Sequence, residues 1–353
     1  MSTNPGGADV PALAALSLHD LDALLARFDE PRYRAKQVFE AVQRRAVLDP
    51  EEMTTLPRSL RARLTETVAP PATRLEEAQE SADGTVKLLL GLADGRRVET
   101  VIIPEGERRT VCVSTQVGCP VGCVFCASGV DGLVRNLTTA EIAEQVLHAV
   151  RHLGGRPSHI VVMGMGEPLL NLRQLEPALR LWIAKDGLGF SPRRITVSTA
   201  TTATLVDKLI DTGLGVNLAV SLHGPDDITR SRLVPTNRPG QVESLVEAAI
   251  RYARRTGRDA TVEYVLIEGE NDRPADADAL ARLLAGRHVH LNLIPLNPVD
   301  HRPDLHAPSR VAAQAFARRV EEAGASVTLR SRRGDDIEAA CGQLALKRTE
   351  REA

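Results

Sequence analysis

Residues 112–129 read CVSTQVGCPVGCVFCASG and contain four of the five cysteines in the chain. Three of them, Cys119, Cys123 and Cys126, follow the spacing C-x3-C-x2-C, which lets three thiolates converge on one small object from a single loop. A structural zinc ion takes four ligands, whereas an iron–sulfur cube held by three cysteines keeps one iron open for a further ligand. The spacing favours the iron–sulfur site. A zinc site completed by a remote residue, and buried or disulfide-bonded cysteines, are the alternatives.

The composition is that of an ordinary soluble globular protein, with 43% hydrophobic and 25% charged residues. The sequence has no apolar run of about 18 residues, and its N-terminus lacks the basic start and apolar core of a secretory signal. We therefore expect a cytoplasmic protein with no membrane span, in which cysteines serve metal binding or catalysis rather than disulfide staples. The net charge of −2 argues against a positively coated protein but leaves room for a local nucleic-acid-binding patch.

The first third of the chain predicts small accessory units. Residues 1–15 lack periodicity and predict a disordered tail. Apolar residues recur at helical spacing over 16–72, which predicts a small N-terminal helical accessory domain. Its middle, residues 32–63, carries eight Lys or Arg against four Asp or Glu, as either a solvated helix face or an RNA-backbone contact. Residues 73–108 contain two strand-like runs joined by an Asp-Gly turn, which predicts an adapter hairpin.

From residue 109 onward, strand-like runs alternate with helical ones. This rhythm predicts an α/β fold, a partial (β/α)6 TIM-like barrel over residues 109–335, followed by a C-terminal tail over 336–353. The expected strands are 110–116, 159–165, 194–200, 216–223, 260–269 and 290–298, with a last strand at 326–331. The expected helices are 139–153, 172–186, 202–213, 240–256, 275–286 and 309–324.

Polar and glycine-rich signatures follow the predicted strands where each strand ends. Because the active site of such a barrel lies at the carboxyl ends of its strands, we expect these residues to meet on one face. Glycines let a backbone approach a ligand closely, and Glu167 in the segment GMGEP can accept a hydrogen bond from an amine. Taken singly, each is more often a strand-end group that satisfies the backbone. The signatures are the cysteine loop, GMGEP at 164–168, Ser198, Ser221-Leu222-His223 and Asn297.

Three further residues have two interpretations each. Glu99, within the hairpin sequence VETV, could face solvent or act as a general base. Cys112 and Cys341 remain once the cysteine triad is assigned. They are either inert buried thiols or a nucleophile with its resolving thiol.

The ordered motifs resemble the RlmN/Cfr family of radical S-adenosylmethionine (SAM) RNA methyltransferases. The match runs from about residue 83 to about residue 346 and includes ETVIIP, CVSTQVGC, FCASG, RNLTTAEI, MGMGEPLLN, ITVST, LAVSLHGP, NLIPLNP and RGDDIEAACGQL. The resemblance implies that Cys119, Cys123 and Cys126 hold a 4Fe–4S cluster whose open iron takes the amino and carboxylate groups of SAM. It also implies SAM contacts by Gly166, Glu167, Ser198, Ser221, Leu222, His223 and Asn297.

The resemblance further implies a covalent route. Cys341 matches the cysteine that is first methylated by one SAM, and a second SAM gives a 5′-deoxyadenosyl radical that takes hydrogen from that methyl group. The resulting methylene radical adds to an adenine carbon, and Glu99 matches the proposed base that removes the ring proton. Cys112 then displaces the product by forming a disulfide with Cys341. Such a route suits C2 and C8 of adenine, which are poor nucleophiles toward SAM.

We therefore expect methylation of adenine C2 in 23S rRNA, with tRNA as a further candidate substrate, by a monomer that draws on a reductant such as flavodoxin. The target adenosine must be unstacked and splayed into the barrel mouth. One alternative is C8 methylation of the same adenosine, as in the Cfr branch, which would suggest antibiotic resistance. Others are a radical SAM enzyme acting on a peptide or small molecule, and a non-catalytic iron–sulfur protein that binds RNA.

Overall fold

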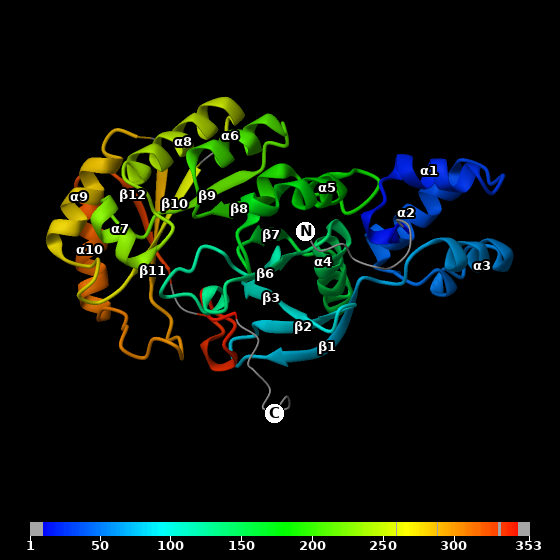
Figure 1. Ribbon diagram of the computed structural model, residues 1–353, viewed down its shortest axis with the longest axis horizontal. Helices are drawn as coiled ribbons and strands as arrows, with labels where there is room; N and C mark the ends of the chain where they lie inside the picture. Colours follow the sequence, from blue (N-terminus) through cyan, green and yellow to red (C-terminus); the bar gives the residue numbers. More distant parts are fainter. Residues whose placement is uncertain (1–9, 259, 288, 331–332, 345–353) are drawn as a thin grey trace.

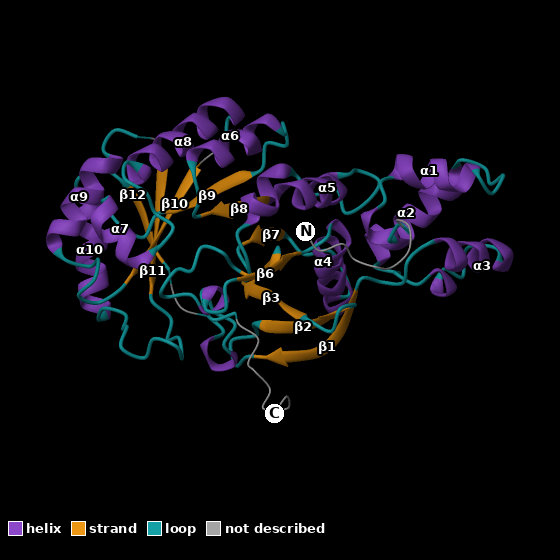
Figure 2. Ribbon diagram, viewed as in Figure 1, coloured by secondary structure: helices purple, strands orange, loops and turns teal. Residues whose placement is uncertain are grey.

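The computed structural model describes residues 10–258, 260–287, 289–330 and 333–344. Its centre is a curved ten-stranded sheet (Figure 2) with the order β1-β2-β3-β4-β7-β8-β9-β10-β11-β12. Strands β1 to β4 pair antiparallel, and the strands from β4 to β12 pair parallel. The strands are β1 Thr73–Glu80, β2 Val86–Leu92, β3 Arg97–Glu105, β4 Arg108–Cys112, β7 His159–Val162, β8 Ile195–Thr199, β9 Asn217–Ser221, β10 Ala260–Leu266, β11 Val289–Pro295 and β12 Ser326–Leu329.

Helices cover the outer face of the parallel part of this sheet (Figure 1). Their buried sides pack with the outward-facing strand residues in one continuous apolar core. This alternation of parallel strands and outer helices confirms the predicted α/β fold, a partial (β/α)6 barrel. These helices are α4 Thr139–Leu153, α5 Leu172–Ile183, α6 Ala203–Asp211, α8 Gln241–Thr256, α9 Pro274–Leu284 and α10 Arg310–Glu322. Helix α7 Asp227–Leu233 instead packs its Leu233 in a separate apolar cluster with Val121 and Phe125. Short 3₁₀ turns are η3 Ala127–Gly129, η4 Pro168–Asn171, η5 Pro192–Arg194 and η6 Asp335–Ile337.

Most of the expected barrel elements form within a few residues of their predicted bounds. Helix α4 has the predicted bounds 139–153, because a capping box of Thr138 and Glu141 begins it and Gly154 ends it. The predicted strand 110–116 is wrong in its second half. Strand β4 ends at Cys112, and residues 116–118 pair instead with 133–136, as β5 (Gln116–Gly118) and β6 (Leu133–Asn136).

Strand β1 and helix α7, like β6, were not expected from the sequence. Strand β1 is mostly exposed and polar, so it lacks the alternation that marks a strand; it forms because it pairs with β2 along its whole length. Helix α7 is too short for its periodicity to stand out. The predicted hairpin is confirmed as β2 and β3, and pairing of β3 with β4 makes it continuous with the barrel sheet.

The N-terminal helices lie beside the barrel (Figure 1) and are η1 Leu13–Ala15, α1 Leu18–Ala26, α2 Tyr33–Arg45, η2 Pro50–Glu52 and α3 Arg58–Thr67. The expectation of a disordered tail up to residue 15 is wrong at its end, because Leu13 and Ala14 are buried in the core. Residues 1–9 lie outside the described residues.

Part of the basic run in α2 holds this helix against the barrel. The Arg44 guanidinium donates hydrogen bonds to the carbonyl oxygens of Lys185 and Gly187, both at 3.0 Å. Lys36 forms an ion pair with Asp186 at 3.1 Å. These two cations contact the segment after α5, and Arg61 and Arg63, which belong to the same basic stretch of residues 32–63, donate to backbone carbonyl oxygens within the helical unit.

Candidate active site

Several residues predicted for the site share the inner face of the sheet. Paired residues on neighbouring strands point to the same face, as do alternate residues along one strand. Cys112 pairs with Val161 in β7, and Val161 pairs with Thr196 in β8. Ser198, two residues beyond Thr196, therefore lies on the same face. Its hydroxyl lies 3.2 Å from that of Ser221 in β9.

The same face continues into the antiparallel strands. Val101 in β3 pairs with Cys112, so Glu99, two residues earlier, shares the face of the Cys112 thiol. Glu99 is buried and forms an ion pair with Lys87 at 3.2 Å. The Ser114 hydroxyl donates to the backbone carbonyl of Glu99 at 2.7 Å. The alternative that Glu99 faces solvent is therefore wrong.

The cysteine loop forms a separate small apolar cluster at the carboxyl end of the barrel. Val121 and Phe125 are buried there, and Cys119, Cys123 and Cys126 pack against the same cluster. Backbone hydrogen bonds hold the loop, from the Cys126 N–H to the Cys123 carbonyl and from the Val124 N–H to the Leu233 carbonyl, both at 3.0 Å. The loop thus presents three half-buried thiols from an apolar base.

The three thiols are desolvated, and their charges affect one another's pKa. Desolvation raises the pKa of Cys119 to about 12, with an added effect of Cys126. Desolvation also raises the pKa of Cys123, and the charges of Cys126 and Cys119 add to it. Desolvation is again the main cause that raises the pKa of Cys126. Three desolvated sulfurs are best stabilised as thiolates by a soft cationic partner, which fits an iron–sulfur cluster.

Among the residues that the structure describes, no three His, Cys, Asp or Glu side chains converge tightly enough to hold one metal ion. The charges of Cys119, Cys123 and Cys126 nevertheless act on one another's pKa, so the three thiols lie in one region of the loop.

Glu167 links the GMGEP segment to the end of β8. One carboxylate oxygen accepts from the Thr199 hydroxyl at 2.7 Å and from the Leu169 N–H at 3.2 Å, and the other accepts from the Ala200 N–H at 2.9 Å. Burial raises the pKa of Glu167, and these hydrogen bonds oppose the rise. A carboxylate offers about four acceptor positions, so Glu167 can still accept from an amine.

The glycines of GMGEP have a packing role that the sequence did not reveal. Gly166 has φ of +99°, and a Cβ built on it would lie 2.6 Å from Cβ of Gln116 and 2.8 Å from its backbone nitrogen. A side chain would therefore push this segment away from the residues that follow β4. The absent side chain lets the segment and the cysteine-bearing stretch lie in contact.

His223 and Leu222 continue beyond the end of β9. The Leu222 N–H donates to the Glu263 carbonyl at 2.9 Å, and its side chain is fully buried. The His223 Nδ1 accepts from the Val265 N–H at 3.1 Å, which leaves the ring proton on Nε2. Burial lowers the pKa of His223 to about 3, so the ring is neutral. It meets Phe125 edge to face, with ring centroids 4.8 Å apart.

Asn297 connects the barrel to the C-terminal tail. Its amide Nδ2 donates to the backbone carbonyl of Cys341 at 2.9 Å. Its Oδ1 is buried and has no hydrogen-bond partner within the described ranges. A buried acceptor of this kind costs free energy unless a donor reaches it. The site therefore offers an acceptor to a ligand such as SAM, which carries donors.

The tail lies directly on the cysteine loop. The Ala127 N–H donates to the Gly342 carbonyl at 2.8 Å, and the Ser128 hydroxyl donates to the Leu344 carbonyl at 2.5 Å. A Cβ at Gly342, where φ is +86°, would lie 3.1 Å from the Phe125 carbonyl oxygen. The part of the tail at 345–353 lies outside the described residues.

Cys341 and Cys112 lie within electrostatic reach of each other. Desolvation raises the pKa of Cys112 to about 12, and the charge of Cys341 adds to it. Desolvation also raises the pKa of Cys341 to about 12, with smaller effects of Cys126, Glu263 and Arg330. The described residues include all five cysteines, and each is a free thiol. The disulfide between Cys112 and Cys341 stays a prediction for one stage of the reaction.

Sequence reasoning missed two groups of this site. Arg230 is fully buried and donates to the carbonyl oxygens of Ala200 and Leu222, where β8 and β9 end. Its charge also opposes the rise in the pKa of Cys123. Glu263 extends the inner face, because it pairs with Ser221. The alternation of apolar and polar residues in β10 could have indicated that Glu263 faces the site. No comparable pattern marks Arg230, which lies in the short helix α7.

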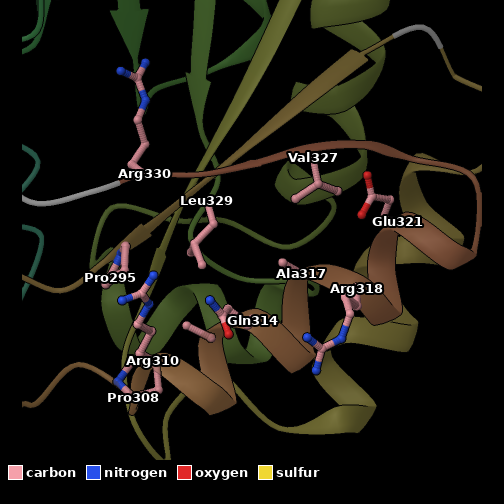
Figure 3. A pocket seen from close by; sticks show the side chains of 11 residues that line it. Pro295, Pro308, Arg310, Gln314, Ala317, Arg318, Glu321, Val327, Leu329 and Arg330 are labelled. Atoms are coloured by element: carbon pink, nitrogen blue, oxygen red, sulfur yellow. The ribbon is translucent and has the colours of Figure 1, made fainter. Parts of the chain in front are cut away.

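A groove of about 1000 Å³ lies elsewhere, between α10 and β12 (Figure 3). Val327 and Leu329 line it from the outward side of β12, and Arg310 and Arg318 line it from α10. None of the residues predicted for the site is among its lining residues.

Two family models match the chain. The model described as the radical SAM superfamily matches residues 113–281, and that of the ribosomal RNA large subunit methyltransferase N-terminal domain matches residues 12–69. The described residues contain no helix long and apolar enough to cross a membrane.

Similar proteins cover almost the whole chain. The probable dual-specificity RNA methyltransferase RlmN of Rhodopirellula baltica is 48% identical over 95% of this chain and 90% of its own length. That of Thermus thermophilus is 44% identical over 89% of each chain. The crystal structure of a radical SAM methyltransferase from Sphaerobacter thermophilus has a TM-score of 0.90 and 44% identity, covering 95% of this chain and 99% of the other. The resemblance noted in the sequence is thus confirmed, and this SAM-dependent RNA methyltransferase belongs to the RlmN family of radical SAM enzymes.

Proposed function

We propose that this enzyme methylates C2 of an adenosine in 23S rRNA, and of an adenosine in tRNA, through a methyl group carried on Cys341. The single observation that carries the proposal is the docking of the tail. Its Cys341 carbonyl accepts from Asn297, and Gly342 accepts from the cysteine loop. This contact holds the carrier thiol over the barrel mouth, within electrostatic reach of Cys112.

The cofactors would be held by the residues described above. Cys119, Cys123 and Cys126 would hold the 4Fe–4S cluster, and SAM would lie against seven residues at the strand ends. When bound, the cluster supplies single electrons, which SAM needs for reductive cleavage and which can return as the product forms. The Oδ1 of Asn297, which has no partner within the described residues, and the one remaining acceptor position of Glu167 support this placement. The seven residues are Gly166, Glu167, Ser198, Ser221, Leu222, His223 and Asn297.

Three side chains would carry the covalent steps on RNA. Cys341 bears the carbon that becomes joined to the adenine ring. Glu99 accepts the ring proton, and the electron pair of that C–H bond returns to the ring. The Cys112 thiolate then attacks the sulfur of Cys341, so that the S–S bond forms as the C–S bond breaks. The electron pair of the C–S bond passes to the methylene carbon and the adenine ring, this carbon takes up a proton from water to become the methyl group, and the methylated adenosine leaves. An external thiol or protein reductant must reopen the disulfide before another cycle.

The high pKa of Cys112 suits this order of events. With a pKa of about 12, the buried Cys112 is protonated at neutral pH and reacts slowly with oxidants. Cys112 becomes a nucleophile once a base nearby removes its proton, which limits disulfide formation to the loaded site. The free state of both thiols in the structure is consistent with the stage before RNA binds.

The test is to identify the product in RNA. The protein is expressed in a bacterial strain that lacks its own enzyme of this family, and rRNA and tRNA are digested separately to nucleosides for mass spectrometry. We expect 2-methyladenosine in both pools with the wild-type protein and in neither with Cys341→Ala. Detection of 8-methyladenosine instead would establish the C8 alternative, and unmodified adenosine in both pools would contradict both RNA reactions. A pool of tRNA without the product would restrict the substrate to rRNA.

A further inference from the structure

Lys87 forms a buried ion pair with the predicted base. Its Nζ lies 3.2 Å from Oε1 of Glu99, and the two side chains are only 11% and 5% exposed. Lysine is among the residues least often buried, because removing its charge from water is costly. Replacing such a pair by apolar residues is often neutral or stabilising. Stability alone therefore does not explain why the barrel keeps these two charges.

The register of the sheet places Lys87 beside the reacting groups. Lys87 in β2 pairs with Val101 in β3, and Val101 pairs with Cys112 in β4. These three residues form one row across the inner face. Glu99 lies two residues before Val101 in β3, on the same face. At the usual strand spacing, the backbone of Lys87 is roughly 10 Å from that of Cys112. Both ion-pair partners thus belong to the wall of the predicted active site.

The ion pair is not needed to join the two strands. The backbones of β2 and β3 already pair from Val86 opposite Ile102 to Gly91 opposite Arg97. The side-chain pair adds an electrostatic effect instead. A buried carboxylic acid tends to hold its proton, and a neighbouring cation favours the ionised form. A carboxylate must be ionised before it can accept a proton.

We propose that Lys87 is a positioning residue for Glu99, which it keeps ionised and oriented toward the adenine ring. This inference rests on the proposed function of Glu99 as the base. When the ring proton moves to the carboxylate, the electron pair of the C–H bond returns to the ring, and Lys87 keeps its own protons. Lys87 therefore touches neither the RNA nor the reacting atoms and acts through Glu99.

The experiment compares Lys87→Met, Lys87→Arg, Glu99→Gln and Cys341→Ala with the wild-type holoenzyme. Lys208→Met is the matched control, because Lys208 is exposed on α6, away from the inner face. Three quantities are measured in single turnover from about pH 6 to about pH 9. They are the rate of RNA methylation, the fraction of protein covalently joined to RNA on a denaturing gel, and the methylation of Cys341 by mass spectrometry.

We expect Lys87→Met to methylate Cys341 normally but to slow RNA methylation about tenfold or more near neutral pH. Its covalent RNA adduct should accumulate, because the adduct cannot be released until the adenine ring proton has been removed. Its rate should recover as pH rises, since the carboxylate then ionises without help. Lys87→Arg should restore most of the rate, and Lys208→Met should behave as wild type. A purely structural role would change Cys341 methylation and would not move the pH profile.

The experiment distinguishes a failure of the proposed function from a failure of the inference about Lys87. If Glu99→Gln and Cys341→Ala methylate RNA like the wild type, the proposed function fails. If those variants are inactive but Lys87→Met keeps the wild-type rate and pH profile, the inference about Lys87 is overturned while the function stands. A Lys87→Met enzyme that is slow at every pH to the same degree, or that no longer methylates Cys341, overturns the inference as well.

Discussion

Replacing Arg230 with methionine should destabilise the protein where β8 and β9 end. The Arg230 side chain is fully buried. It donates to the carbonyl oxygens of Ala200 at 2.7 Å, Leu222 at 2.9 Å and Ser221 at 3.2 Å. A fourth hydrogen bond reaches Oδ1 of Asn237 at 2.6 Å. Methionine has a similar length but no donor, so four buried acceptors would lose a partner.

The magnitude follows from two opposing contributions. A hydrogen bond from a charged donor contributes about 1.5 to 3 kcal/mol, so the four together contribute roughly 6 to 12 kcal/mol. Burial lowers the pKa of Arg230 to about 10, which means that the fold holds this cation at a cost of about 3 kcal/mol. Methionine removes that cost too. We expect a net loss of about 3 to 9 kcal/mol in the free energy of unfolding, which is the hydrogen-bond contribution less the cost of burying the cation.

The assay is anaerobic urea unfolding followed by tryptophan fluorescence. Trp182 is the one tryptophan of the chain and is fully buried in α5, so its emission reports on the barrel. Arg230→Lys keeps the charge but not the planar fork, and about half of the loss should remain. Arg251→Met is the control, because Arg251 forms an exposed pair with Asp207 and should change stability by less than about 1 kcal/mol. If Arg230→Met matched this control, the reasoning would be refuted.

Three further changes give separate tests. Cys119→Ala should abolish the broad absorbance at about 400 nm of the reconstituted protein, whereas Cys341→Ala should keep it. If the absorbance persisted in Cys119→Ala, the assignment of Cys119 as a cluster ligand would be contradicted. Asn297→Ala removes a hydrogen bond worth about 1 kcal/mol, so hydrogen exchange at residues 339–344 should quicken about fivefold, and unchanged exchange would show that Asn297 does not hold the tail. Burial lowers the pKa of His223 from 6.5 to about 3, so stability present above pH 6.5 is lost as pH falls toward about 3, at about 1.4 kcal/mol per pH unit. Unfolding free energies at about pH 7 and about pH 5 should therefore differ less in His223→Gln than in wild type, and equal differences would refute the effect.

Elements could be predicted from the sequence where the residues that mark their two ends lie in the local sequence. Helix α4 was placed correctly, because Thr138, Glu141 and Gly154 are local signals at its two ends. The cysteine loop could be predicted because three thiols at short spacing need no distant partner. Strand β1 was missed for the opposite reason, since its polar residues become a strand only through pairing with β2.

Chain topology explains why the strand-end signatures could be assigned to one face, while the wall of the site could not be foreseen. The carboxyl ends of parallel strands meet at one edge of a barrel, so the order of elements alone predicts that edge. Period-two alternation shows that Glu99 and Lys87 belong to strands, but their contact depends on the register between β2 and β3. A shift of one residue in that register would turn the two side chains to opposite faces.

The sequence by itself determined the family and the fold class of this protein. It contains the cysteine spacing that predicts an open iron–sulfur site and the alternation of strands and helices that predicts a barrel. Only the tertiary structure decided which distant residues meet. Ser128 contacts Leu344 across 216 residues, and Lys87 neutralises Glu99 inside the wall. The physical reason is that periodicity and capping are recorded within a few residues of chain, whereas long-range pairing depends on how complete elements pack.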